Sequence, residues 1–432
     1  IDNSRAAAAV RRLSGRWGPA KVLFDPAVAK EALDLEEFFS RLESAVTSYG
    51  GPEGWAAAFG GHDTVRRDVT RILVYGGRLL SEANSRPYLW ERIGHSTLTD
   101  AVPPAGDAKR WGIHIGNALF HYGVSFLSGE LGAMDLTASW TGEIDAAVQA
   151  LAGDLTAQDP AIGVIALGKW GGGELAPDAD LDLMFVAPPC DYAALARAQQ
   201  RAVNWMLKID PGGRLQLDAR LRPEGSGAPM VSTLPRIRDY LAGRADPWEK
   251  IALVRARAVA GNMEIAREAV EVLQQFTTQP PTTEKQWAAL HRARKRAAKE
   301  TSKGSRLLNI KKGRGGMMDF EFATTFAAWS LKLPPGPEWS RPLPERMRII
   351  ANASGDERWQ KAAVFYSELR RWELSNIIAG GRKAAEMAND GGEGETTAKR
   401  IGMTPETVQE KWNDTAAVAL DLYHSFARIV HE

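Results

Sequence analysis

Cysteine is almost absent from the sequence, and its single example, Cys190, excludes a fold held together by internal disulfide bonds. This scarcity fits a reducing compartment, so we expect a cytoplasmic protein. No apolar run is long enough to cross a bilayer, and no signal-peptide pattern opens the chain, so a membrane partner is not expected. A charge excess is also missing, because Lys+Arg 54 against Asp+Glu 53 gives a formal net charge of +1. That balance offers no support for bulk binding to nucleic acid.

The remaining composition is that of an ordinary globular protein. Hydrophobic residues make up 44% of the chain and charged residues 25%. A length of 432 residues predicts two or three domains. The chain opens with Ile1 rather than Met, so we expect either a trimmed chain or a piece of a longer protein. The seven histidines show no metal-ligand spacing and are interpreted as structural.

The hydrophobic pattern divides the chain into three parts. Helical periodicity dominates the first part and returns after residue 263, with long helices expected over 284–301, 358–379 and 405–430. Between them lie strand-like runs at 162–167, 181–186, 214–221 and 251–260, with a helix over 192–208. The pattern predicts an α+β fold, in which a mixed sheet with helices is flanked by two helical domains. The expected domains are residues 1–158 (helical), 159–262 (catalytic α/β) and 263–432 (helical).

The most informative segment is Gly168–Val186, which reads GKWGGGELAPDADLDLMFV. Asp180 and Asp182 alternate along a strand, so both side chains project from the same face. Two adjacent carboxylates repel each other unless a cation lies between them. Carboxylate oxygens suit Mg²⁺, and Mg²⁺ beside a glycine-rich turn suits nucleotide phosphates. The segment therefore predicts a nucleotidyltransferase site that holds magnesium.

A third carboxylate is available in the later run LQLDARLRPEGSG, where Asp218 lies among alternating apolar residues. If this strand pairs beside the strand of Asp180 and Asp182, the three carboxylates meet at one edge of the sheet. They would then hold two Mg²⁺ ions and activate the attacking oxygen. Arg220 and Arg222 would neutralise triphosphate charge. The simpler alternative is that these aspartates cap turns or pair with nearby arginines.

Glycines and basic residues supply candidate phosphate contacts. Gly168, Gly171 and Gly172 would let the backbone approach a phosphate, and Lys169 would add a point charge, although a glycine-rich turn alone is often only a turn. A second basic glycine loop begins at Ile310, and its Lys311, Lys312 and Arg314 are candidates to reach phosphate. Arg255 and Arg257 would line the cleft if they alternate on a strand. Capping of a helix and a solvated edge strand explain these last two groups nearly as well.

The ordered set of motifs resembles the glutamine synthetase adenylyltransferase family (glutamate–ammonia-ligase adenylyltransferase), a branch of the nucleotidyltransferase superfamily. The resemblance is carried by Gly168-Lys169, the Gly-Gly-x-Glu-Leu at 171–175, the Asp-x-Asp at 180–182 and Asp-x-Arg-Leu-Arg-Pro-x-Gly at 218–225. Trp248-Glu249, the Arg-Ala-Arg at 255–257 and the Gly-Arg-Gly-Gly at 313–316 complete it. Order and spacing agree from about residue 161 to 325. Gly173 and Ala179 depart from the usual Arg and Ser.

The resemblance implies transfer of AMP from ATP to a tyrosine of glutamine synthetase, with a PII-type signalling protein as a possible regulatory partner. Full-length members carry two related halves, of which the second removes AMP by phosphorolysis to ADP. This chain has one Asp-x-Asp site and resembles a single half, and its motifs are more similar to the transferring half. Three alternatives stay open: a nucleotidyltransferase with another acceptor, a module that binds nucleotide without catalysis, and a helical scaffold.

Overall fold

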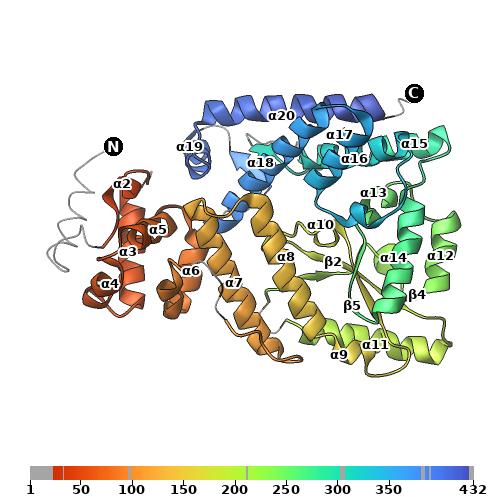
Figure 1. Ribbon diagram of the computed structural model, residues 1–432, viewed down its shortest axis with the longest axis horizontal. Helices are drawn as coiled ribbons and strands as arrows, with labels where there is room; N and C mark the ends of the chain where they lie inside the picture. The colour runs from red at the N-terminus through yellow and green to blue at the C-terminus, as the bar shows by residue number, and fades with distance from the viewer. Residues whose placement is uncertain are drawn as a thin grey trace.

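The computed structural model describes residues 23–427, except for residues 33, 96–97, 99, 211–212, 302–306, 381–384 and 389–390. A mixed sheet lies between an N-terminal group of helices and a C-terminal group, which Figure 1 shows in red to orange and in green to blue. The α+β fold with helices on both sides of the sheet is thereby confirmed. Over these residues, every helix is too short or too polar to traverse a bilayer.

The N-terminal helices pack around one apolar core that also reaches the sheet. Asp34 begins α3 by accepting hydrogen bonds from the backbone N–H groups of Glu36 and Glu37, as N-cap residues do. Gly76 separates α5 from α6, so the apolar pattern there belongs to two helices. The elements are α2 (Pro26–Ala29), α3 (Leu35–Ser48), α4 (Pro52–Phe59), α5 (Asp63–Tyr75), α6 (Gly77–Ser85), η2 (Pro87–Arg92), α7 (Ala108–Ser128), α8 (Ala133–Ala150) and α9 (Gly153–Thr156).

The main sheet has five strands in the order β3-β2-β1-β5, with β4 also paired to β2. β1 is antiparallel to β2 and β5, whereas β2 is parallel to β3 and β4. The strands are β1 (Gly163–Ala166), β2 (Leu181–Ala187), β3 (Leu217–Asp218), β4 (Val231–Thr233) and β5 (Arg257–Gly261).

Both faces of this sheet are buried, which explains why β2 is continuously apolar from Leu183 to its end. Leu183 and Phe185 join the core formed with α8 and α11 (Tyr192–Lys208). Met184 and Val186 join a second core with α12 (Leu234–Gly243) and α14 (Met263–Thr277). The alternation fixes which residues of β2 face each layer of helices.

Two predicted strands differ from the observed ones. The run 214–221 was expected to form one strand, but only Leu217–Asp218 pairs, because Arg220 and Arg222 fold back onto nearby acceptors. The run 251–260 is divided between α13 (Glu249–Leu253) and β5, so Arg255 lies outside any strand. The short strand β4 follows Met230 and lies outside every predicted run.

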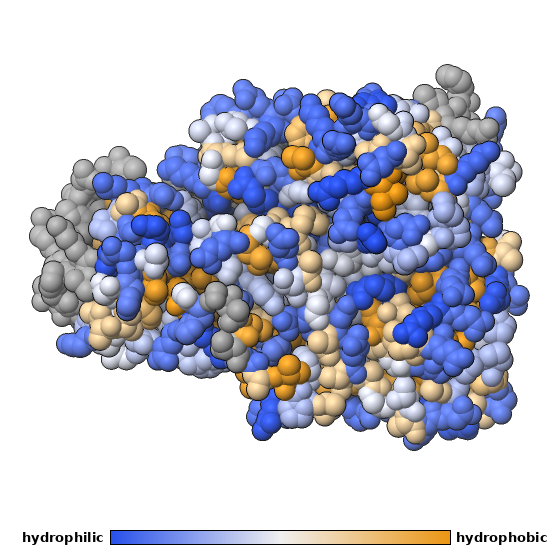
Figure 2. All heavy atoms as spheres, viewed as in Figure 1, coloured by the Kyte–Doolittle hydropathy of each residue, from blue (hydrophilic) through white to orange (hydrophobic). Residues whose placement is uncertain are grey.

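The C-terminal part is helical and contacts both other parts. α18 ends in Ile377 and Ile378, which belong to the N-terminal core. Apolar side chains are gathered mainly inside, and Figure 2 shows hydrophilic residues over most of one face, with small apolar groups between them. The elements are α15 (Glu284–Thr301), β6 (Leu307–Asn309), α16 (Met317–Ser330), η4 (Pro337–Ser340), α17 (Leu343–Ser354), α18 (Arg358–Ala379), β7 (Glu386–Ala388), α19 (Gly391–Arg400) and α20 (Pro405–Phe426).

Candidate active site

The three predicted carboxylates meet at the edge of the sheet where β2 begins. In the parallel pairing of β2 and β3, Asp182 lies directly opposite Asp218. Asp180 lies two positions before Asp182, immediately before the strand. The side chain of Asp180 is 51% exposed and that of Asp218 only 12% exposed. The predicted pairing of these two segments is therefore confirmed.

Negative charge at this edge is only partly balanced by the protein. Burial, followed by the neighbouring carboxylate of Asp218, raises the pKa of Asp182 to about 6, and Asp180 acts in the same direction. Lys311 acts in the opposite direction and favours the ionised form. Among the basic residues of the second glycine loop, Lys311 therefore acts on the carboxylates. Lys312 instead lies 3.4 Å from Glu300, and Arg314 is exposed.

Gly168 makes room for the Asp182 carboxylate. Its φ of +55° lies in the left-handed region, and a Cβ atom here would approach Asp182 Oδ2 to 2.5 Å. The backbone N–H of Leu167 also donates to the Asp182 carbonyl over 2.8 Å. Gly168 begins a single helical turn, α10 (Gly168–Gly171), which holds this segment against the start of β2.

Gly171 and Gly172 allow close packing against the chain that leads into β5. A Cβ atom on Gly171 would lie 2.2 Å from the carbonyl oxygen of Arg255. One on Gly172 would lie 2.8 Å from Arg255 Cδ. Both positions thus require glycine because of neighbouring protein atoms, and their contact with phosphate stays a prediction.

Arg220 and Arg222 point in different directions. Arg220 donates from Nε to Asp218 Oδ2 over 2.7 Å, and its Nη2 lies 3.8 Å from Asp180. Its side chain is 73% exposed, so it can turn toward a ligand. Arg222 is buried and donates to the carbonyl oxygens of Ala219 and Ala228 over 2.6 and 2.9 Å. The structure places Arg220 at the carboxylates and Arg222 in the support of the following loop.

Arg255 and Arg257 are both held by protein carboxylates. Arg255 is buried and donates to Glu174 over 2.7 Å and to Glu321 over 3.1 Å. Arg257 lies 2.6 Å from Asp145 of α8. The expected alternation of the two arginines along one strand is wrong, because β5 begins at Arg257. Their side chains join the sheet to helices on two sides of the site.

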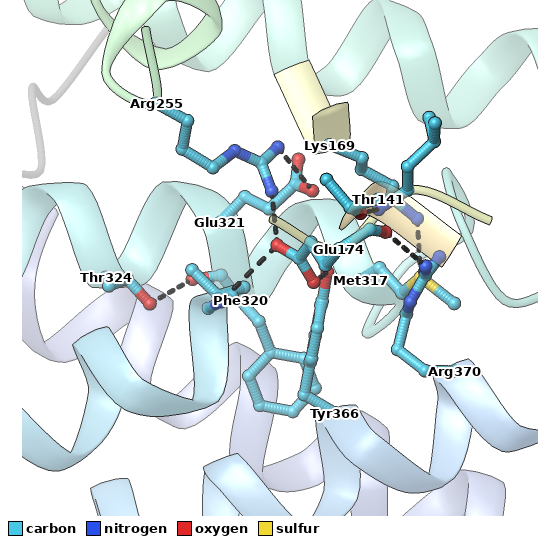
Figure 3. Close-up of polar contacts among 12 residues, drawn as sticks. Thr141, Lys169, Glu174, Arg255, Met317, Phe320, Glu321, Thr324, Tyr366 and Arg370 are labelled. Carbon is cyan, nitrogen blue, oxygen red and sulfur yellow. Dashed lines mark hydrogen bonds and ion pairs between the residues drawn. The ribbon is translucent and has the colours of Figure 1, made fainter. Parts of the chain in front are cut away.

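Glu174 is the centre of a buried polar network that the motifs did not single out as functional (Figure 3). Its side chain is fully buried and accepts hydrogen bonds from Arg255, from the backbone N–H of Leu343 over 3.3 Å and from the Tyr366 hydroxyl over 2.9 Å. Its backbone carbonyl accepts from Arg370 over 2.6 Å. Glu174, which lies between α10 and β2, thereby connects the sheet to α17 and α18.

Lys169 joins this network through Glu373, which pairs with Arg370. Its Nζ lies 3.5 Å from Glu373 and 3.3 Å from the sulfur of Met317. Burial lowers the pKa of Lys169 to about 8, with a further contribution from the nearby Arg370. Lys169 thus carries a buried ammonium group, and its pKa depends on the charges of Arg370 and Glu373.

The donor chemistry of the three aspartates fits a magnesium ion. In the part of the chain that the structure describes, however, no three His, Cys, Asp or Glu side chains are arranged so that they could hold a metal ion. Arg220 occupies the position beside Asp218 and Asp180, and it is exposed and able to turn away. Burial is the largest cause of the raised pKa of Asp182, and repulsion from the Asp218 and Asp180 carboxylates adds to it; a cation would relieve that repulsion. The carboxylates therefore fit Mg²⁺ in chemistry and in charge.

Comparison with known proteins shows that this region is similar to one family. Residues 135–272 match the profile of the family described as glutamate-ammonia ligase adenylyltransferase. The predicted resemblance to this family is confirmed. The matched residues include the three aspartates, Glu174 and Arg255, whereas Glu321 and Tyr366 lie beyond them.

Individual relatives are bifunctional glutamine synthetase adenylyltransferase/adenylyl-removing enzymes. The Bordetella bronchiseptica enzyme is 33% identical over 172 residues, the Mycobacterium tuberculosis H37Rv enzyme 34% over 204, and the Xanthomonas campestris (strain B100) enzyme 36% over 178. The matches cover 39%, 43% and 38% of this chain. They span only 18%, 20% and 19% of those adenylyltransferases, about a fifth of their length.

Proposed function

We propose that this chain transfers AMP from ATP to a tyrosine hydroxyl of glutamine synthetase. The observation that carries the proposal is the pairing of Asp182 with Asp218 at the start of β2, with Asp180 beside them. A cluster of carboxylates at the edge of a sheet is costly to maintain unless it holds cations. The names of the relatives supply the reaction and the acceptor, and the matched residues include all three aspartates.

Asp180, Asp182 and Asp218 would hold two magnesium ions, which when bound would neutralise phosphate charge and orient the nucleotide. The tyrosine oxygen forms a bond to the α-phosphorus of ATP while the bond to pyrophosphate breaks. The tyrosine proton is lost to solvent or to a carboxylate. Gly168 keeps the Asp182 carboxylate in place, because any larger residue would displace it.

The basic residues would act on the phosphates from two sides. Arg220 is exposed and would turn from Asp218 toward the nucleotide. Lys311 already acts electrostatically on Asp182 and would approach from the second glycine loop. Lys169 lies one residue after Gly168 and would contribute its charge from within the protein. Arg222, Arg255 and Arg257 would act by supporting the loop and strands that carry these groups.

A second candidate is the removal of AMP, in which phosphate attacks the phosphorus of adenylyl-tyrosine, the bond to the tyrosine oxygen breaks and ADP forms. The names of the relatives contain both activities, and the same carboxylates serve either reaction. The sequence Asp218–Gly225 and the Arg-Ala-Arg at 255–257 resemble the transferring half, which favours the first candidate. A PII-type signalling protein as regulator and a cytoplasmic location are further expectations that follow from the resemblance.

Intact-mass spectrometry of glutamine synthetase tests the proposal directly. One reaction contains this protein, ATP and Mg²⁺, and a parallel reaction contains adenylylated synthetase and phosphate. Addition of AMP in the first reaction supports the transferase, and loss of AMP in the second alone identifies the removing half. If both masses stay unchanged, the acceptor is wrong or the site only binds nucleotide.

Two single-atom substitutions make this test specific to the site. Asp182→Asn should abolish transfer, because it removes a charged ligand while keeping the shape of the side chain. Asp178→Asn is the matched control, since Asp178 is exposed, lies four positions earlier and pairs with Arg78 instead. It should keep wild-type turnover. Transfer by Asp182→Asn at the wild-type rate would sink the assignment.

A further inference from the structure

An open cleft lies between the residues before α13 and the helix α15, outside the carboxylate edge. Its volume is about 330 Å³. Ala289, Ala293 and Ala297 line it at intervals of one helical turn. Arg292 and Arg296 lie beside them, and Trp248 lines the cleft from the opposite segment. The cleft thus combines a small-residue surface with two arginines and one aromatic ring. Two carboxylates also line it, those of Asp246 and of Glu300, and Glu300 lies 3.4 Å from Lys312.

Trp248 is held in an exposed position by its neighbour. Its side chain is 40% exposed, whereas the other tryptophans in the described residues are buried. The next residue, Glu249, is buried and accepts hydrogen bonds from the backbone N–H of Asp246 over 2.8 Å and from the Tyr240 hydroxyl over 2.6 Å. These bonds fix the turn that carries Trp248. A turn built by a buried carboxylate to present a large ring indicates a contact surface.

In the described structure, the arginines of the cleft are not paired with the two carboxylates that line it, Asp246 and Glu300. Within the described part of the chain, neither Arg292 nor Arg296 forms an ion pair, although most of the other arginines near the sheet do. Helix α15 contains six Lys or Arg residues and two Glu, whereas the whole chain has a formal net charge of +1. Of the six, only Arg294 is buried, where it pairs with Asp319. Positive charge is therefore concentrated on the exposed side of this helix.

We propose that the cleft binds an acidic segment of the protein acceptor, with an apolar or aromatic side chain of that segment against Trp248. The identification of the acceptor rests on the proposed function, but binding itself does not. Arginine pairs with carboxylates through two parallel hydrogen bonds. The cleft-lining residues of α15, from Ala289 to Glu300, extend over about 18 Å, so an extended segment of about five residues matches them better than a compact ligand does.

Fluorescence anisotropy with a labelled peptide tests this inference. The probe is an eight-residue peptide of glutamates around one central phenylalanine, measured against the full chain. Arg292→Glu with Arg296→Glu should weaken binding by about tenfold or more, because two attractive contacts become repulsive. Lys285→Glu with Lys295→Glu is the matched control, since it makes the same charge change on the same helix outside the cleft. It should weaken binding less than about threefold.

The aromatic contact has its own test. Replacing the central phenylalanine of the peptide by alanine should weaken binding to the wild type, but not to Trp248→Ala. Equal losses in the cleft and control variants would show a general charge effect and overturn the inference. Displacement of the peptide by AMP at comparable concentration would also overturn it, in favour of a nucleotide site. Circular dichroism confirms that each variant is folded.

The transfer reaction separates this inference from the proposed function. The cleft variant should raise KM for glutamine synthetase by about tenfold while kcat stays near wild type, since the carboxylates are untouched. A fall in kcat with unchanged KM would overturn a docking role. If the wild type binds the peptide through the cleft but transfers no AMP, the proposed function fails and the binding surface stands.

Discussion

Removal of the Glu174 carboxylate should destabilise the protein more than any change at the exposed carboxylate edge. Three donors depend on this side chain: the Arg255 guanidinium, the Leu343 N–H and the Tyr366 hydroxyl. Glu174→Ala leaves the Leu343 N–H and the Tyr366 hydroxyl buried without this acceptor, and Arg255 keeps only its contact with Glu321. Each unsatisfied buried group costs about 1–3 kcal/mol, and breaking a buried ion pair costs about 3–5 kcal/mol. We expect Glu174→Ala to lower the free energy of unfolding by about 3–5 kcal/mol.

A graded series makes this expectation refutable. Glu174→Gln keeps an acceptor of the same shape and should cost about 1–3 kcal/mol. Tyr366→Phe removes one donor together with its hydrogen bond and should cost about 1 kcal/mol. Urea unfolding, followed by tryptophan fluorescence and by circular dichroism, gives the three free energies. A loss below about 1 kcal/mol for Glu174→Ala, or the same loss in all three variants, would refute the network as described.

Two further predictions concern single positions. Gly168→Ala should reduce AMP transfer at least tenfold, because the new Cβ would displace the Asp182 carboxylate. Gly129→Ala is the control, since Gly129 also has a positive φ but open space around it, and it should leave transfer unchanged. Turnover and urea unfolding of both variants check this prediction. Burial lowers the pKa of Lys250 from 10.5 to about 8, so the folded state holds its proton less tightly than the unfolded state. The free energy of unfolding of the wild type relative to Lys250→Met should therefore rise as the pH increases from about 8 to 10.5, and it should stay constant below about pH 8. Urea unfolding at pH 7, 9 and 10.5 measures this difference. A slope of the opposite sign would contradict the burial of this lysine.

The sequence predicted the regular elements well because their signals are local. The bounds of α11, α15 and α18 agree with the predicted helices, and Thr404 caps α20 by accepting from the Thr407 N–H. Alternation identified the carboxylates of the Asp182 and Asp218 segments, but the pairing of the two segments was only a condition of that prediction, and the structure meets it. These features depend on residues a few positions apart, or on strands whose apolar faces allow only one register.

The roles of the arginines could not be predicted in the same way. Whether Arg255 faces a nucleotide or a protein carboxylate depends on Glu174, which is 81 positions away. Glu174 in turn depends on Tyr366, 192 positions further along the chain. A glutamate in a glycine-rich motif gives no local sign that it is fully buried. The roles of Arg255 and Glu174 can be assigned only when the position of α18, which carries Tyr366, is known.

The reach of α17 and α18 into the Glu174 network has a consequence for how the protein can be divided. A fragment that ended at residue 272 would contain every residue matched to the family. Its Glu174 would keep Arg255 but lose both the Leu343 N–H and the Tyr366 hydroxyl. In such a fragment the Glu174–Arg255 pair, which is buried in the full chain, would be exposed to solvent. The smallest fragment suitable for enzymology is therefore decided by the hydrogen bonds that Glu174 accepts from α17 and α18. It extends beyond the recognisable motifs to the end of α18.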